Sequence, residues 1–127
     1  MDDEVKKMRF NFNSSEPIYL QVAQQIQDAI FTKTYAEGEQ IPSTTEISRD
    51  FHINPATVLK GMNLLVADGL IEKKRGIGMF VVEGAQGKIV EKRREFFYQD
   101  EVVKLISEAK KLQISQEELV DLIKRGF

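Results

Sequence analysis

The sequence predicts an α+β protein in which three short helices and a two-stranded β-hairpin form a head, and a helical hairpin follows. Three observations lead to this arrangement. Helix-start signals occur at Ser43 and at Asn54-Pro55, two strand-like runs separated by glycines follow Gly69, and residues 88–127 have helical spacing of apolar side chains. The 127 residues suffice for one domain of about 100 residues with an appendage. We therefore expect no large second domain.

An N-terminal arm is expected over residues 1–15. Apolar and polar residues alternate from residue 8 to residue 13, which is the pattern of an extended segment with one apolar side. Met8, Phe10 and Phe12 should therefore lie on a hydrophobic surface, either of the same head or of a second subunit.

The first helix should follow this arm. Ser14 or Ser15 can cap it, and Pro17 falls within its expected first turn, where proline is tolerated. Apolar residues then recur every four positions, which places them on one buried face. These residues are Ile18, Val22, Ile26 and Ile30.

The second helix is predicted to start at Ser43. Residues 43–46 read Ser-Thr-Thr-Glu, the spacing of a capping box in which the serine hydroxyl and the glutamate carboxylate each bind a backbone N–H group. Ile47 and Phe51 lie four residues apart and should share the buried face of this helix.

The third helix should begin at Pro55 after a short turn, because Asn54 is a favoured N-cap and proline at the first helical position lacks a donor that the helix does not use. Gly69 should end it in a left-handed conformation. Two helices joined in this way form a helix-turn-helix, whose second helix commonly enters the major groove of DNA. The predicted buried side consists of Val58, Met62, Leu65 and Val66.

A β-hairpin is predicted next. Residues 70–74 and 79–82 are strand-like, and Gly76 and Gly78 between them supply the glycines of a tight turn. The segment 41–42 can add a short strand to this sheet. A basic hairpin directly after a helix-turn-helix forms a wing.

A series of motifs runs in order through residues 16–82: Pro17-Ile18-Tyr19, Gly38 to Ser43, Glu46-Ile47, Asn54-Pro55-x-Thr57-Val58, Asp68 to Ile71 and Gly76-x-Gly78-x-Phe80-Val81. In order and spacing these motifs resemble the winged helix-turn-helix domain of GntR-family bacterial transcription regulators. The form of the motif at residues 54–58 and the short C-terminal region resemble the YtrA-like subfamily, whose members are small dimeric repressors often tied to transporter operons. The resemblance implies a double-stranded DNA operator and a homodimer as partners.

Candidate DNA-binding residues fall into three groups: the start of the second helix, the side of the third helix that faces away from the core, and the wing. Lys60 can reach a phosphate or a guanine edge, and Asn63 can pair with adenine. Instead of contacting DNA, Thr57 could form a hydrogen bond within its own helix. The basic wing residues could likewise form a hairpin tip that is only exposed to solvent. The candidates are Ser43, Thr44 and Thr45; Ala56, Thr57, Lys60 and Asn63; and Lys73, Lys74, Arg75, Gly76 and Gly78.

Three arginines that related regulators commonly carry are absent, since Thr45, Pro55 and Leu59 occupy their positions. Each missing bidentate base contact can remove about 1–3 kcal/mol of discrimination. The formal net charge of −2 also does little to attract DNA. We therefore expect weaker affinity per subunit, greater dependence on the wing, and a different operator.

The C-terminal part is expected to be a flexible linker, residues 83–87, followed by a helical hairpin. One long helix should run from Lys88 to Leu112, and residues 115–118 repeat the capping-box spacing before a second, short helix. About 40 residues are too few to bury their own apolar faces, so we expect the hairpin to pair with a second copy around a two-fold axis. Aromatic residues 96–98 could instead line a small effector pocket. The candidate dimerisation residues are Phe96, Phe97, Val103, Ile106, Leu119, Leu122 and Ile123.

The sequence does not indicate an enzyme, a metal site or a cofactor. His52 has no partner at metal-ligand spacing, there is no cysteine, and Gly76-x-Gly78 lacks the rest of a dinucleotide-binding loop. No segment has the character of a signal peptide or a membrane span, so we expect a cytoplasmic location. The alternatives to a sequence-specific regulator are a protein-interaction module and a non-specific architectural DNA binder.

Overall fold

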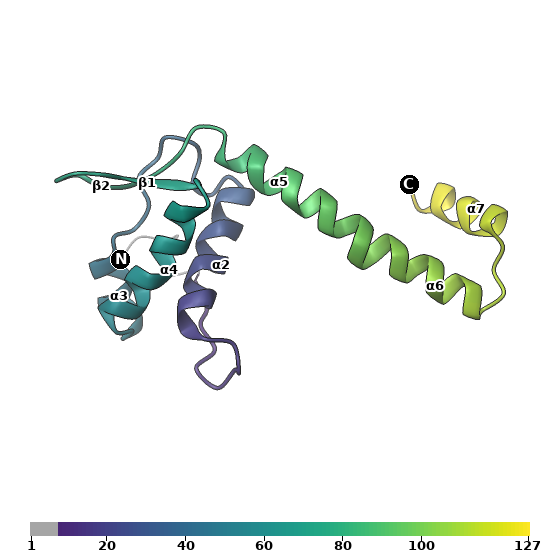
Figure 1. The fold of residues 1–127 in the computed structure, drawn as a ribbon, viewed down its shortest axis with the longest axis horizontal. Helices are drawn as coiled ribbons and strands as arrows, with labels where there is room; N and C mark the ends of the chain where they lie inside the picture. The colour runs from purple at the N-terminus through teal and green to yellow at the C-terminus, as the bar shows by residue number, and fades with distance from the viewer. Residues whose placement is uncertain (1–7) are drawn as a thin grey trace. The chain divides into compact units, whose positions relative to one another are not determined.

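The computed structural model describes residues 8–127, and the chain forms two compact units, the head (Met1–Val90) and the tail (Glu91–Phe127). The order of elements confirms the predicted winged helix-turn-helix followed by C-terminal helices (Figure 1). The head contains α2 (Ile18–Phe31), α3 (Thr44–Phe51), α4 (Pro55–Ala67), β1 (Ile71–Lys74), β2 (Gly78–Val81) and the start of α5 (Ala85–Phe96). The tail continues with the π-helix η1 (Phe97–Val102), α6 (Val103–Lys111) and α7 (Gln116–Gly126).

One apolar core holds the head together, and α2, α3, α4 and the hairpin all contribute to it. The predicted buried faces are confirmed with three differences: Ile18 and Phe51 are only partly buried, and Val66 is 41% exposed. Val66 lies about 100° around the helix from Leu65 and so leaves the buried stripe. The largest fully buried side chains are Val22, Ile26, Ile30, Ile47, Val58, Met62, Leu65, Ile71 and Val81.

The helix-turn-helix has the predicted caps. The Glu46 N–H donates to Ser43 Oγ (3.0 Å), and the Ser43 N–H donates to Glu46 Oε1 (3.2 Å). α3 ends at His52, whose φ is 55°. The Ala56 N–H then donates to Asn54 Oδ1 (2.8 Å), and Pro55 opens α4. Both helices therefore start where local capping chemistry predicts.

α4 ends as predicted at Gly69, whose φ is 73°. The Gly69 N–H donates to the Val66 carbonyl and the Leu70 N–H donates to the Leu65 carbonyl, both at 3.0 Å. This pair of bonds is the Schellman motif, which requires a left-handed residue. It turns the chain directly into β1.

The start of α2 differs from the prediction. Pro17 is the N-cap residue rather than part of the first turn, and no side chain caps the helix. Ser14 Oγ instead accepts the Glu16 N–H (3.1 Å), which closes a turn before the helix. Ser14 and Ser15 are too far from the helix start at Ile18 to act as its N-cap.

Two glutamines of α2 hold the segment that precedes it. The Gln21 amide accepts from the Asn11 N–H (2.8 Å) and donates to the Asn11 carbonyl (3.0 Å). Gln25 makes the same two bonds with Arg9. Each amide thus pairs with the arm as a neighbouring strand would.

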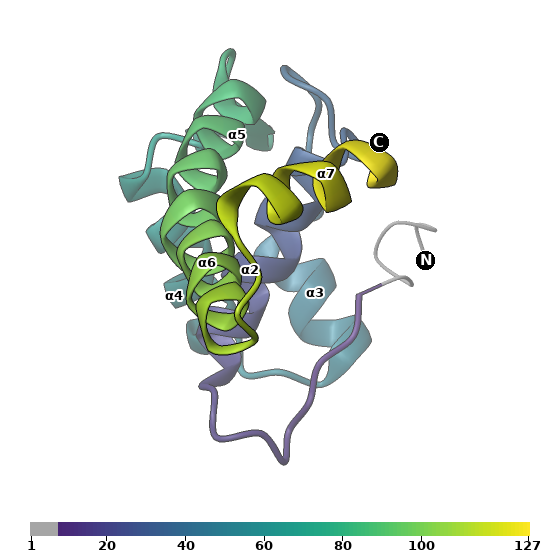
Figure 2. The ribbon, with the colours of Figure 1, turned by 90° about the vertical axis from the view of Figure 1, so that its right-hand side faces the viewer.

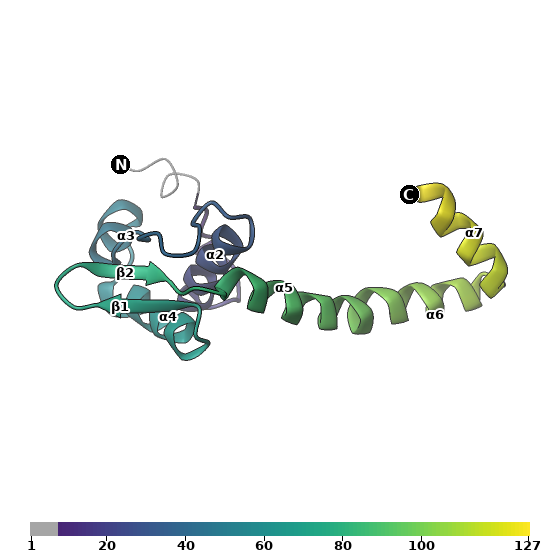
Figure 3. The ribbon, with the colours of Figure 1, turned by 90° about the horizontal axis from the view of Figure 1, so that it is seen from above.

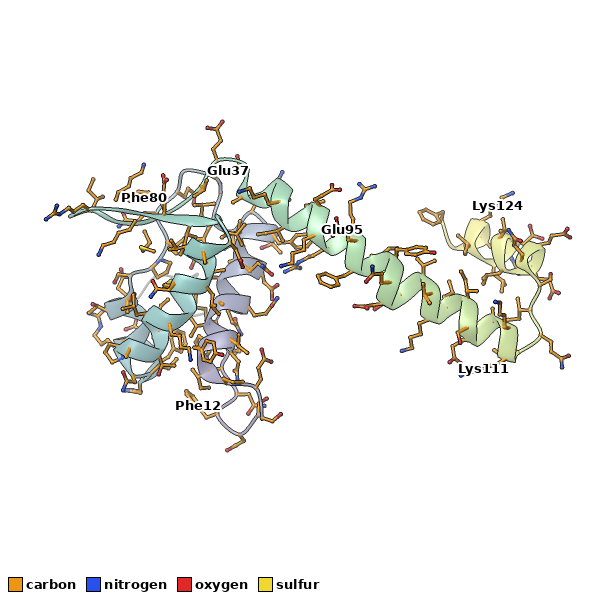
Figure 4. The ribbon with its side chains drawn as sticks, in the orientation of Figure 1. Phe12, Glu37, Phe80, Glu95, Lys111 and Lys124 are labelled. Atoms are coloured by element: carbon orange, nitrogen blue, oxygen red, sulfur yellow. The ribbon has the colours of Figure 1, made fainter. Side chains whose placement is uncertain are left out.

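The arm packs on its own head through two of the three apolar residues that were predicted to lie on a hydrophobic surface. Met8 is buried, and the Phe10 ring meets the Phe51 ring edge-on at a centroid distance of 4.9 Å. Phe12 does not pack on its own head, because it is 62% exposed at the turn before α2 (Figure 4). Residues 1–7 of the predicted arm lie outside the described residues.

The flexible linker predicted at residues 83–87 is wrong from Ala85 onward. α5 begins at Ala85, and Ala85 and Ile89 are both buried in the head core. The Gln86 amide also donates to the Phe31 carbonyl at 3.3 Å. Residues four apart on one helix face dock against the head, so Gly87 lies within a docked helix.

The long helix predicted from Lys88 to Leu112 is interrupted by η1. A π-helix has wider turns than an α-helix, so α-helical spacing relates Val103 to Ile106 within α6 but does not relate either residue to Phe96 across η1. α7 begins at the predicted capping box, where the Glu118 N–H donates to Ser115 Oγ (3.1 Å). A short turn joins α6 to α7 (Figure 2). None of the helices in residues 8–127 combines the length and the apolar character needed to cross a bilayer.

The crossing of α2 and α4 gives a first prediction. A Cβ atom at Gly61 of α4 would lie 2.6 Å from the Tyr19 carbonyl oxygen and 3.0 Å from Val22 Cβ. Gly61→Ala should therefore lower the free energy of unfolding by about 1–3 kcal/mol, since a backbone carbonyl cannot yield as a flexible side chain can. Denaturant titration at fixed protein concentration measures this change.

Gly87→Ala is the matched control for the same chemical change. Gly87 also lies within a helix, but a Cβ atom there would meet nothing within 4 Å. The higher helix propensity of alanine should leave the free energy of unfolding unchanged or raise it by up to about 1 kcal/mol. Equal effects of the two substitutions would contradict the proposed close crossing.

Candidate nucleic-acid interface

The wing is an antiparallel hairpin whose tip extends beyond α3 and α4 (Figure 3). Lys74 pairs with Gly78 at its outer end, and the Ile77 N–H donates to the Lys74 carbonyl (2.9 Å) across the turn. Gly76 and Gly78 have φ values of 76° and 145°. These left-handed conformations explain why both predicted turn positions hold glycine.

The positive charges of the wing are spread around it. Side chains alternate across a strand, so Lys73 shares a face with buried Ile71, whereas Lys74 lies on the other face with Phe80. Lys74 Nζ is 4.5 Å from the centroid of the Phe80 ring, which Figure 4 labels on the hairpin. Arg75 is exposed at the tip. Together the three cations can approach phosphates on more than one side of the hairpin.

Gln40 supports the wing tip, a role that sequence reasoning missed. The strand predicted at residues 41–42 is reduced to one bridge between Gln40 and Phe80. The Gln40 amide then donates to the Ile77 carbonyl at 3.0 Å. A Cβ atom at Gly78 would collide with this amide. Gln40 therefore fixes the tip, and Gly78 leaves room for it.

The side of α4 that faces away from the core presents most of the predicted residues. Ala56, Lys60 and Asn63 are exposed there, and Thr57 is half-buried. Lys60 Nζ lies 4.0 Å from the centroid of the Tyr19 ring on α2. Tyr19 was not predicted to act in binding, because only the packing of the two helices brings it beside α4.

The start of α3 has its hydrogen-bonding groups only partly occupied. The Ser43 N–H donates to Glu46 Oε1, and the Ser43 hydroxyl oxygen accepts from the Glu46 N–H, which leaves the hydroxyl proton free to donate. Thr44 and Thr45 follow as the first two helical residues, and their backbone N–H groups have no partner within an α-helix. A phosphate at this position could therefore be bound by the N–H groups of Thr44 and Thr45 and by the Ser43 hydroxyl, close to the Glu46 carboxylate.

An apolar groove of about 490 Å³ lies between α6 and α7 in the tail. Three predicted dimerisation residues line it: Ile106, Leu119 and Ile123. The other four, Phe96, Phe97, Val103 and Leu122, are exposed elsewhere on the tail. Throughout residues 91–127, all of which are described, Ala109 is the one buried side chain.

Residues 18–81 match the family described as "Bacterial regulatory proteins, gntR family". The chain belongs to the GntR family. This family comprises DNA-binding transcription regulators, so the predicted resemblance and the general function are both confirmed. Within residues 8–127 no group of three His, Cys, Asp or Glu side chains is placed to hold a metal ion.

Two relatives from Bacillus subtilis (strain 168) match most of the chain. The HTH-type transcriptional repressor YtrA is 32% identical over 111 residues, which cover 87% of this chain and 85% of YtrA. The uncharacterized HTH-type transcriptional regulator YhcF is 31% identical over 113 residues, which cover 89% of this chain and 92% of YhcF. Both are regulators rather than enzymes, and both extend the likeness beyond the head.

The chain is also similar to a solved structure of the AraR DNA-binding domain in complex with operator ORX1. It is 28% identical in sequence, with a TM-score of 0.54, over 58% of this chain and 93% of that chain.

The basic wing gives a second prediction. Replacing Lys73, Lys74 and Arg75 with alanine should weaken binding to all DNA sequences alike, because phosphate contacts carry no sequence information. The slope of log K against log[salt] should become shallower by roughly 2–3, near 0.9 for each phosphate that the protein no longer neutralises. Fluorescence anisotropy at several salt concentrations measures the slope.

The control removes the same charge from the tail by replacing Lys104, Lys111 and Lys124 with alanine. All three are exposed, and Figure 4 labels the last two. An unchanged slope in the wing variant, or an equal change in the tail variant, would show that the wing does not contact phosphates.

Proposed function

We propose that this protein is a cytoplasmic, homodimeric repressor that binds a specific DNA operator and controls a small operon, such as a transporter operon. The observation that carries the proposal is the exposed face of α4 beside a basic wing on one head. A helix of this kind can enter the major groove while the wing contacts the adjacent backbone. The repressor role is supported by the name of YtrA, and operator binding by the AraR complex.

The exposed apolar surfaces of the tail are evidence for the proposed homodimer. The tail's α6 and α7 leave an open apolar groove and several exposed aliphatic side chains, so they do not form a core of their own. An isolated pair of short helices is marginally stable in water. A second copy that packs around a two-fold axis would cover these surfaces. Two heads would then occupy half-sites about one helical turn or more apart.

Dimerisation also compensates for what each head lacks. The positions of Thr45, Pro55 and Leu59 carry no positive charge, so a single head has few strong contacts with bases or phosphates. Linking two heads makes the second binding event intramolecular, which raises affinity without any new kind of contact. Any small effector would act at the tail, either in the groove or at the interface between the two copies.

The proposed function is tested by anisotropy titrations that compare DNA from upstream of the protein's own gene with a shuffled duplex of equal composition, at two salt concentrations. We expect tighter binding to the native sequence, and a preference that persists at higher salt. Equal binding that salt abolishes would indicate an architectural DNA binder, and no binding would favour a protein-interaction module.

The proposed dimer is tested in the groove between α6 and α7. Leu119→Ser together with Ile123→Ser introduces hydroxyl groups there and should convert the dimer to a monomer in sedimentation-velocity runs. Affinity for a two-half-site duplex should fall at least tenfold, whereas the weak affinity for one half-site should not change. Leu112→Ser is the control, because Leu112 is 70% exposed and does not line the groove. A double variant that remains dimeric would contradict the proposed interface.

A further inference from the structure

The outward face of α4 consists of four side chains from its first three turns. Ala56, Leu59, Lys60 and Asn63 follow the spacing i, i+3, i+4 and i+7, which places them together on one side of a helix. All four are exposed, whereas Val58 beside them is fully buried. These four side chains therefore supply the chemical groups that this face of α4 can present to a DNA groove.

Lys60 is the charged member of this face, and its ammonium group has a defined position. It lies 4.0 Å from the centroid of the Tyr19 ring, which belongs to α2. This cation–π contact draws the charge to the flank of α4. A helix in the major groove has base edges in front of it and phosphates along its flanks. Lys60 is thus placed to contact a phosphate rather than a guanine.

The other three side chains are neutral. Leu59 is 48% exposed, which is more than Leu64 (37%) and Val66 (41%) of the same helix. In the major groove, apolar side chains contact the C5-methyl group of thymine, and an asparagine amide can bond N6 and N7 of adenine. Guanine is most often read by arginine or lysine. The neutral part of the face therefore matches the two bases of an A·T pair.

We propose that α4 reads A·T base pairs, with Leu59 and Ala56 against thymine methyl groups and Asn63 on an adenine edge. The inference rests on the proposed sequence-specific DNA binding and adds to it the composition of the bases that α4 contacts. The wing and Lys60 supply phosphate contacts, which position the head without selecting a sequence.

The first experiment selects binding sites for the full-length protein from a random duplex library. We expect each half-site to contain consecutive A·T pairs at the positions that α4 faces. A motif in which those positions hold G·C pairs would overturn the reading by α4 and leave sequence-specific binding intact. The absence of any enriched motif would overturn both this inference and the proposed function.

The second experiment replaces each thymine of the selected duplex with deoxyuridine, which removes the C5-methyl group alone. At a contacted thymine, affinity should fall roughly fourfold, the ratio that transfer of one methyl-sized group predicts. Leu59→Ala should bind the thymine and uracil duplexes equally at that position. This loss of discrimination separates a base contact from a general effect on folding.

Leu64→Ala is the matched control. It removes the same atoms from another leucine of α4. Leu64 is 37% exposed and lines a shallow groove with Leu20 of α2. This variant should keep the full preference for thymine over uracil. No uracil effect in the natural protein, or an undiminished effect in Leu59→Ala, would overturn the inference.

The adenine contact is tested with 7-deazaadenine, which lacks the N7 acceptor. This base should weaken binding of the natural protein at one position of each half-site and have no effect on Asn63→Ala. Lys60→Met should weaken binding to all duplexes alike and reduce the salt slope by about 1. A selective loss of affinity for G·C duplexes in Lys60→Met would instead show that Lys60 reads guanine and would overturn the assignment.

Discussion

The close crossing of α4 over α2 at Gly61 is the constraint on which the head depends. The glycine lets the backbone of α4 approach the Tyr19 carbonyl and the Val22 side chain. This approach fixes the rotation of α4 about its own axis, because Val58 and Met62 must then enter the core. The remaining side of the helix faces outward. The surface that we propose to face DNA is thus determined by a packing contact on the opposite side of the same helix.

The same crossing brings Lys60 to Tyr19 and so assigns the cation to one flank of α4. A comparable arrangement occurs at the wing, where Lys74 lies over Phe80 and Gln40 binds the tip carbonyl of Ile77. Long lysine side chains lose considerable entropy when a ligand immobilises them, about 1.5–2 kcal/mol each. Aromatic rings that already restrict these two ammonium groups reduce the loss on binding. Neither Tyr19 nor Phe80 is among the candidate DNA-binding residues predicted from the sequence.

What could be predicted from the sequence depended on local chemistry. The capping boxes at Ser43 and Ser115, the Asn54 cap and the left-handed Gly69 each involve neighbours within a few residues, so the sequence contains all the information that they need. The exposed position of Phe12 and the docking of Ala85 depend on contacts with distant parts of the head. Periodicity identified the apolar residues but not the surface that each would meet.

The π-helix η1 shows a different limit of sequence-based prediction. No glycine or proline marks residues 97–102. Spacing rules for an α-helix also do not distinguish the hydrogen-bonding pattern of an α-helix from that of a π-helix. Face assignments in the tail therefore hold within α6 or within α7 but not across η1.

The mostly neutral outward face of α4 and the incomplete core of the tail both support the proposed homodimer. A head whose reading face is mostly neutral gains specificity from base contacts, each of which provides only a modest free energy. Such contacts become sufficient for operator recognition when two heads act together, because the free energies by which the two half-sites are discriminated from other sequences then add. A tail that is stable only when paired would ensure that the protein is present as a dimer before it meets DNA. Separation of the paired tails would then lower operator affinity without any change at the DNA-binding surface, and a regulatory signal at the tail could act through this coupling.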